Sequence, residues 1–137
     1  MRGKALLMVE AKPVVLCVDD EDTPLLLRKL VLEKAGYDVV TASSVPGALD
    51  IVSSRPIDLV LSDHLMPGST GTELARQIKS RLPQLPVVLL SGVNEVPSDA
   101  DCADLFLSKA VGPVSLCENI ARVLDAARTR NLDRVGS

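Results

Sequence analysis

Five short apolar runs, separated by amphipathic segments, dominate this chain of 137 residues. They are rich in Val, Leu and Ile without regular polar alternation, and they occupy residues 13–18, 37–42, 57–62, 86–90 and 105–108. A strand that is buried on both faces has this appearance, whereas a half-exposed strand alternates apolar and polar residues. The runs therefore predict five strands of a buried parallel sheet.

The segment after the first run predicts a helix. Thr23 is a suitable N-cap residue, and Pro24 would then occupy the first helical position, where its missing N–H removes no hydrogen bond. Leu27, Leu30 and Val31 fall on one side of this helix, so they are predicted to face the core.

Three further segments carry helix signals. The first has an apolar stripe of Ala48, Leu49 and Val52 and ends before Pro56, the second starts with capping-box spacing at Thr70 and Glu73, and the last is predicted to begin near Pro113. Residues 92–104 contain a proline and several aspartates, so this connection is predicted to hold only a short, irregular fourth helix.

Strands that alternate with helices imply an α/β fold, with a parallel sheet and right-handed crossovers. The length suits one domain. The pattern divides the chain into an N-terminal tail at 1–12, a folded domain at 13–128 and a C-terminal tail at 129–137.

Composition and charge argue against several classes of protein. The net charge is −3 and no run of Lys or Arg is present, which disfavours nucleic-acid binding by this domain. No apolar stretch is long enough to cross a membrane. Cys17, Cys102 and Cys117 are scattered and odd in number, so they predict no disulfide framework and favour a reducing cytoplasm.

Polar side chains stand where four of the runs end. Asp19 and Asp20 follow the first run, Asp63 the third, Ser91 the fourth and Lys109 the fifth. The carboxyl ends of parallel strands share one edge of the sheet, which is where ligands bind in open α/β sheets. We therefore predict that these five side chains converge.

This set of groups suits phosphoryl transfer. Three neighbouring carboxylates repel one another unless a cation neutralises them, and Mg²⁺ prefers such oxygen ligands. A carboxylate can attack phosphorus and form an acyl phosphate. The reaction needs mainly positioning and charge neutralisation, to which Lys109 and the Ser91 hydroxyl can contribute.

Four motifs resemble, in the same order, the signatures of response-regulator receiver domains, the CheY-like domains of two-component signalling. They read Val18-Asp19-Asp20-Glu21, Asp63-His64-Leu65-Met66-Pro67-Gly68, Leu90-Ser91-Gly92 and Ser108-Lys109. The resemblance covers roughly residues 13–128 and implies a flavodoxin-like, doubly wound five-stranded sheet of order 2-1-3-4-5.

The resemblance also implies the chemistry of the site. Asp63 would be the phosphoacceptor, and Asp20, Asp63 and the Leu65 carbonyl would be direct Mg²⁺ ligands. Asp19 would act on the metal mostly through water.

Ser91 and Lys109 would contact the phosphoryl group, which gives them the catalytic roles beside Asp63. In the family's switch, the hydroxyl residue moves toward the phosphoryl group and an aromatic residue on the last strand turns inward. Phe106 has that place here, and core packing is an equally weighted alternative for it.

Two features depart from the family pattern. Ala110 follows Lys109 where the family usually has proline, and the stretch between Ser91 and Phe106 is shorter than usual. His64, the single histidine, is predicted to be a solvent-facing loop residue.

The resulting hypothesis is a phosphorelay module. The phosphoryl group would come from a sensor histidine kinase, a phosphotransfer protein or a small phosphodonor, and its arrival would switch binding of an unidentified downstream effector. Weak homodimerisation stays open. The alternative is a non-switching interaction adaptor with the same fold.

A phosphatase with an aspartate nucleophile is disfavoured. Such enzymes place the nucleophile in an Asp-x-Asp run after the first strand, whereas Asp19 and Asp20 are adjacent and Asp63 follows another strand. The protein is therefore predicted not to be an enzyme, beyond catalysing its own phosphorylation and dephosphorylation.

Overall fold

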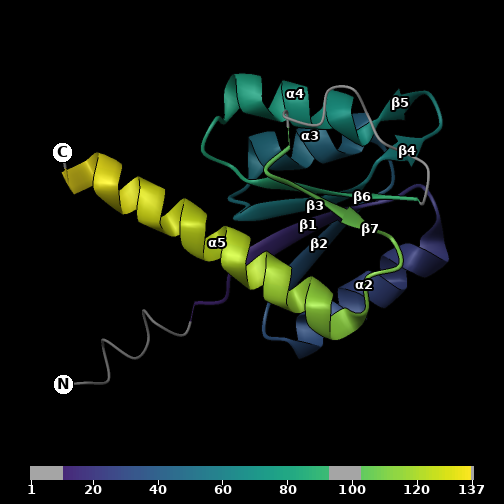
Figure 1. Cartoon of the computed structure of the whole chain (residues 1–137). Coiled ribbons are helices and arrows are strands. Elements are labelled where there is room, and N and C mark those ends of the chain that lie inside the picture. The colour runs from purple at the N-terminus through teal and green to yellow at the C-terminus, as the bar shows by residue number, and fades with distance from the viewer. Residues whose placement is uncertain (1–10, 93–102, 137) are drawn as a thin grey trace.

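The computed structural model describes residues 11–92 and 103–136, which form a five-stranded parallel sheet flanked by helices (Figure 1). The strands of this sheet are β1 (Val14–Val18), β2 (Asp38–Ala42), β3 (Leu59–Asp63), β6 (Val87–Ser91) and β7 (Leu105–Ser108). Their order is β2-β1-β3-β6-β7, with every pair parallel. The predicted sheet and its 2-1-3-4-5 order are confirmed.

Helices cover both faces of the sheet (Figure 1). They are α2 (Asp22–Lys34), α3 (Val45–Ser54), α4 (Gly71–Arg81) and α5 (Pro113–Gly136). Successive strand residues face opposite layers. Leu16 and Val18 pack with α3 and α4, whereas Val15 and Cys17 pack with α2 and α5. This double burial explains the continuous apolar runs.

A small antiparallel hairpin that the sequence analysis did not predict connects β3 to α4. It consists of β4 (Leu65–Met66) and β5 (Ser69–Thr70). Gly68 adopts a φ of 80° in its turn, a conformation that glycine tolerates best. The following helix starts as predicted, because the Thr70 hydroxyl accepts a hydrogen bond of 3.1 Å from the Glu73 N–H.

The prediction for α2 was wrong in two respects. The helix begins at Asp22 with Glu21 as N-cap, so Pro24 lies in the first turn, where a missing N–H is still tolerated. Leu27 and Leu30 are more than half exposed, and the buried residues are instead Leu25 and Leu32. Apolar residues occur on several sides of this helix, so periodicity alone did not identify its buried face.

The last helix is longer than predicted. It continues through Gly136, so residues 129–136 are helical where a C-terminal tail was expected. No proline or glycine interrupts the chain between residues 114 and 135, so nothing in the local sequence stops the helix earlier. Figure 1 shows its C-terminal part extending beyond the sheet.

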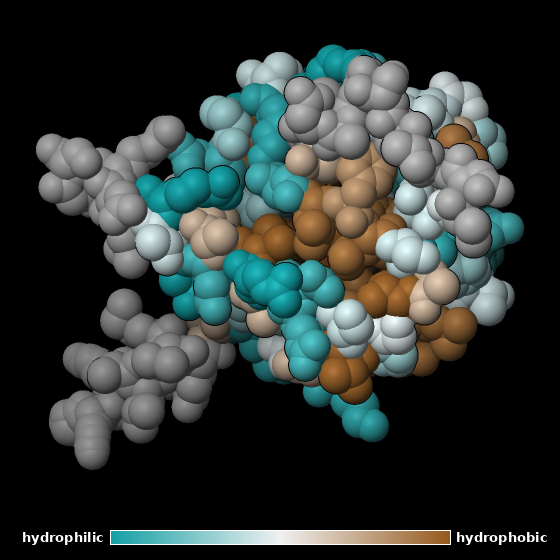
Figure 2. Space-filling model, viewed as in Figure 1, coloured by the Kyte–Doolittle hydropathy of each residue, from teal (hydrophilic) through white to brown (hydrophobic). Residues whose placement is uncertain are grey.

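The predicted irregular helix at 92–104 lies mostly outside the described residues. β7, the strand that follows it, forms an edge of the sheet, and Leu105, Phe106 and Leu107 are only half-buried. Figure 2 shows apolar surface gathered around this strand. Within 11–92 and 103–136, no helix has both the length and the apolar character needed to span a membrane.

Candidate functional site

The sheet brings the predicted site residues to one edge. Asp63 is the last residue of β3, Ser91 is the last residue of β6, and Lys109 directly follows β7. Ser91 and its neighbouring strand stay in register at this edge, because the Lys109 N–H donates a 2.8 Å hydrogen bond to the Ser91 carbonyl. Asp19 and Asp20 come from the end of β1.

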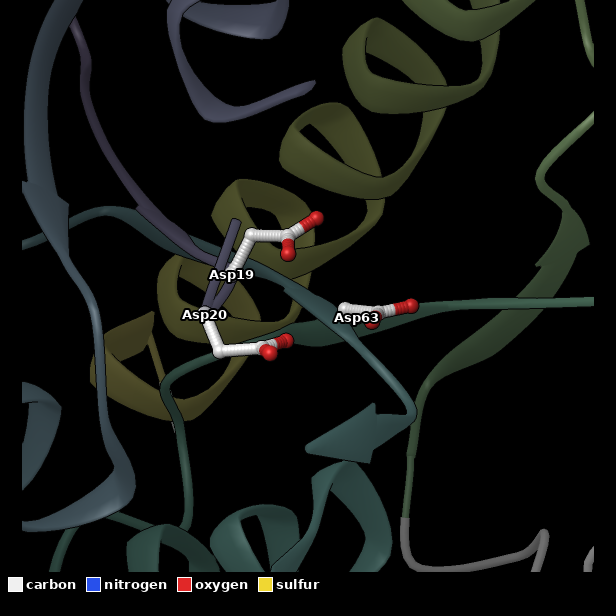
Figure 3. A group of neighbouring side chains, drawn as sticks. All are labelled: Asp19, Asp20 and Asp63. Carbon is white, nitrogen blue, oxygen red and sulfur yellow. The ribbon is translucent and has the colours of Figure 1, made fainter. Parts of the chain in front are cut away.

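Three carboxylates form the centre of the site. One oxygen from each of Asp19, Asp20 and Asp63 lies within 4.8 Å of the others. Figure 3 shows Asp19 and Asp20 beside Asp63, with the carboxylates on the same side of the sheet edge. Asp19 and Asp63 are buried, and Asp20 is exposed. Solvent therefore reaches this group of carboxylates at Asp20, while Asp19 and Asp63 are covered. The three side chains together concentrate negative charge.

Lys109 supplies a cation to this centre. Its Nζ lies 2.7 Å from Asp63 Oδ1, and its side chain is 38% exposed. The turn that follows it is stabilised by the Ser108 hydroxyl, which accepts a 3.0 Å hydrogen bond from the Ala110 N–H. Lys109 therefore reaches Asp63 although alanine follows it instead of proline.

Burial raises the pKa of the Asp63 carboxyl above its ordinary value of 3.8. The hydrogen bond and the charge of Lys109 act in the opposite direction, the negative charge of Asp19 raises this pKa further, and Arg28 lowers it. Asp63 is therefore a desolvated carboxyl group whose ionisation depends on nearby cations.

Comparison with known proteins agrees with this arrangement. Residues 15–121 match the family described as the response regulator receiver domain. This chain belongs to the response regulator receiver family. Receivers of this family are parts of two-component systems and are not conventional enzymes.

Several relatives resemble the receiver over most of its length. The two-component response regulator ORR11 of Oryza sativa subsp. japonica is 32% identical over 121 residues, which cover 83% of this chain and 82% of that protein. A CheY-like receiver domain protein from Methanospirillum hungatei is 26% identical, with a TM-score of 0.81 over 88% of this chain and 99% of that one.

A third relative has been solved with ligands. The response regulator TrrA from Thermotoga maritima, in complex with Mg²⁺–BeF, is 29% identical to this receiver. The TM-score is 0.76, and the match covers 81% of this chain and 98% of that chain.

His64 differs from its prediction as a solvent-facing residue. It is only 6% exposed, its Nδ1 lies 3.3 Å from the Thr72 hydroxyl, and its ring contacts Phe106 edge-on with 5.8 Å between centroids. The His64 N–H donates to the Leu90 carbonyl at 2.8 Å, so the backbone extends the ladder of β3 and turns the ring into the protein. The sequence carried no signal for this burial, since histidine suits both environments.

The positions of Phe106 and Leu65 do not distinguish between the roles that were predicted for them. Phe106 packs partly buried against the core on the α3 and α4 side, which is compatible with packing and with switching. Leu65 lies in the β4–β5 hairpin with a side chain that is 48% exposed. The functions predicted for these two residues stay predictions, as does that of the Ser91 hydroxyl.

Arg28 is a site residue that the sequence analysis missed. Its Nη1 lies 2.6 Å from Asp19 Oδ2, and both side chains are largely buried. Arg28 comes three residues after Leu25 and four before Leu32, so it lies on the buried stripe of α2. A charged residue at helical spacing from buried leucines could have indicated this role. The sequence analysis predicted a different buried face of α2 and therefore missed it.

Proposed function

We propose that this receiver accepts a phosphoryl group on Asp63 in a reaction that depends on Mg²⁺. The observation that carries the proposal is the cluster of three carboxylates in which Asp63 is also paired with Lys109 at 2.7 Å. A buried carboxylate beside a fixed cation is positioned as a nucleophile, and the sheet edge leaves it next to an exposed partner, Asp20.

The donor set fits Mg²⁺. Asp20 and Asp63, with the Leu65 carbonyl, would be direct ligands, and Asp19 would act through water. Carboxylate and carbonyl oxygens are the ligands this ion prefers, and it usually keeps several waters. When bound, Mg²⁺ supplies positive charge to the phosphoryl oxygens and offsets the repulsion among the carboxylates. That the relative TrrA was solved in complex with Mg²⁺–BeF supports this assignment.

The transfer step forms one bond and breaks another. An Asp63 oxygen attacks phosphorus, so a P–O bond forms while the bond from phosphorus to the donor breaks, and the electron pair of that bond leaves with the donor. Lys109 then has a phosphoryl oxygen within its reach and neutralises charge there, while the Ser91 hydroxyl donates a hydrogen bond. Hydrolysis ends the phosphorylated state: water attacks phosphorus, the bond between phosphorus and the Asp63 oxygen breaks, and inorganic phosphate leaves as the Asp63 carboxylate is regenerated.

Phosphorylation would act as a switch through Ser91 and Phe106. The hydroxyl would move toward the new phosphoryl oxygens, and the half-buried ring of Phe106 would turn inward behind it. Its edge-on contact with His64 gives the ring a defined partner in the unphosphorylated protein. The altered face around β7 would then bind a downstream effector protein.

The domain that performs this function would span residues 13–128. Its phosphodonor would be a sensor histidine kinase or a phosphotransfer protein, which membership of a two-component family supports. Buried Cys17 is a free thiol, which suits a reducing cytoplasm. Weak homodimerisation stays part of the proposal, and no nucleic acid is expected as a partner of this domain.

Intact mass measurement tests the proposal. The protein is incubated with acetyl phosphate and Mg²⁺, alongside an Asp63→Asn variant and a sample containing chelator. We expect the mass of one phosphoryl group in the first sample alone. A protein that binds Mg²⁺ but gains no phosphoryl group would be a non-switching adaptor, and the proposed function would be wrong.

A further inference from the structure

Asp19 already has protein partners for both of its carboxylate oxygens. Oδ1 accepts a 2.9 Å hydrogen bond from the Glu21 N–H, and Oδ2 lies 2.6 Å from Arg28 Nη1. The Asp19 side chain is 2% exposed and that of Arg28 is 16% exposed. A carboxylate that is this deeply buried loses most of its hydration and needs a partner that compensates for the loss, and Arg28 is that partner.

Arg28 shares a cavity wall with Lys109. It lines a cavity of about 260 Å³ between α2 and the start of α5, whose wall also includes Lys109, Leu27, Val31 and Leu116. Two cations, Arg28 and Lys109, therefore flank the carboxylates from the same cavity.

The charge of Arg28 acts beyond its direct partner. Asp19 shares its cluster with Asp20 and Asp63, and one oxygen from each lies within 4.8 Å of the others, so a charge paired with Asp19 also acts on the other two carboxylates. The guanidinium thus neutralises part of the charge that a metal ion would neutralise, and it does so from within the protein.

We propose that Arg28 is an internal counter-ion of the acidic centre, which holds Asp19 in the metal-free protein and competes with Mg²⁺ for it. This inference rests on the proposed Mg²⁺ site. Mg²⁺ then binds an environment that already contains a cation, so its affinity is lower than three carboxylates alone would give. The same cation reduces the repulsion among the carboxylates, so the site stays folded without metal. Asp20 and Asp63 remain the oxygens that the ion can approach directly.

The test is Mg²⁺ binding by calorimetry to the complete chain and to three variants. Arg28→Gln removes the charge but keeps a hydrogen-bond donor, and Arg28→Lys keeps the charge. Lys34→Gln is the matched control, because it removes one positive charge from the exposed end of the same helix. Thermal unfolding in chelator measures the stability of the metal-free proteins.

The Gln variant is expected to bind Mg²⁺ about tenfold more tightly than the unchanged protein, by the order of magnitude of a nearby unit charge. The metal-free Gln variant should unfold at a lower temperature than the metal-free unchanged protein. Saturating Mg²⁺ should reduce this difference in unfolding temperature. The Lys variant and the Lys34 control should bind as the unchanged protein does. If the Gln variant folds only when Mg²⁺ is present, this also supports the inference, because the metal-free protein then depends on Arg28 for its stability.

Two outcomes would overturn the inference, and they differ. If the unchanged protein binds Mg²⁺ and Arg28→Gln binds it equally or more weakly, Arg28 does not compete with the metal, while the proposed site survives. If neither the unchanged protein nor any variant binds Mg²⁺, the proposed metal site and the inference both fail.

Discussion

Lys109 Nζ lies 2.7 Å from Asp63 Oδ1, which joins the end of β7 to the end of β3 across the intervening strand β6. The two residues are far apart in sequence, and their meeting depends on the register of three strands. The contact places a cation against a carboxyl group that burial would otherwise favour in its neutral form. It therefore links the fold of the sheet edge to the reactivity of Asp63.

Replacing Lys109 with Met should slow phosphorylation by acetyl phosphate roughly 100-fold, the usual effect of removing one electrostatic donor from a reaction centre. The reason is that the phosphoryl oxygens lose a positive charge, while Met keeps most of the length of the side chain. Initial rates of mass gain in saturating Mg²⁺ measure the effect. A Lys34→Met variant, changed at an exposed position of α2, should react at the original rate. If both variants are phosphorylated at the same rate, Lys109 does not contribute to phosphoryl transfer.

Asp63 should make the metal-free protein less stable as pH rises. Its pKa is raised in the folded chain, so the folded state binds this proton more tightly than the unfolded state does. Any stability gained from protonation is complete below the ordinary value of 3.8 and is lost as pH increases through the raised folded pKa.

Asp63→Asn mimics the neutral carboxyl group, so in chelator it should be more stable than the unchanged protein at pH 7. The difference in free energy of unfolding between the two should shrink as pH falls toward 3.8. Urea unfolding across this range measures it. An Asn variant that is less stable at neutral pH without metal would show that the Lys109 contact outweighs desolvation.

Gly71→Ala should destabilise the protein by about 1–3 kcal/mol, as overpacking of a filled site does. A methyl group there would lie 2.8 Å from the Asp63 carbonyl oxygen, 2.8 Å from Leu89 Cδ2 and 3.0 Å from His64 Cα. Backbone atoms cannot yield without moving Asp63, so phosphorylation should slow as well. Denaturant unfolding checks the first effect, and Gly112→Ala is the control, because nothing lies within 4 Å of its added methyl group.

Thr72→Val should cost about 1–3 kcal/mol, the usual penalty when a buried polar group loses its partner. Thr72 is 4% exposed, and its hydroxyl lies 3.3 Å from the Nδ1 of buried His64. Valine preserves the shape but leaves this nitrogen without the hydroxyl. Guanidinium unfolding gives the change, with exposed Thr41→Val on β2 as the comparison. Equal stability of Thr72→Val and the unchanged protein would mean that the contact contributes nothing.

The strands and the acidic centre were predictable for a local reason. A strand buried on both faces must be apolar throughout, and the residue after it must be polar if it lines a site at the sheet edge. Asp19, Asp20, Asp63 and Lys109 could therefore be identified from their positions after such runs, and the structure brings all four together. The roles of Leu65 and Phe106 came from resemblance alone, whereas that of Ser91 came from its place at a strand end and from the resemblance; all three stay predictions.

The sequence by itself determined the alternation of strands and helices and the polar ends of the strands, because both follow from the burial that each short segment demands. Only the tertiary structure decided which side of α2 faces the core, that Arg28 meets Asp19, and that His64 lies inside against Phe106. These contacts join residues on different elements. Their existence depends on how a helix rotates and how a loop turns over the sheet. In α2, apolar residues occur on several sides, so periodicity alone did not identify the rotation that the tertiary packing selects.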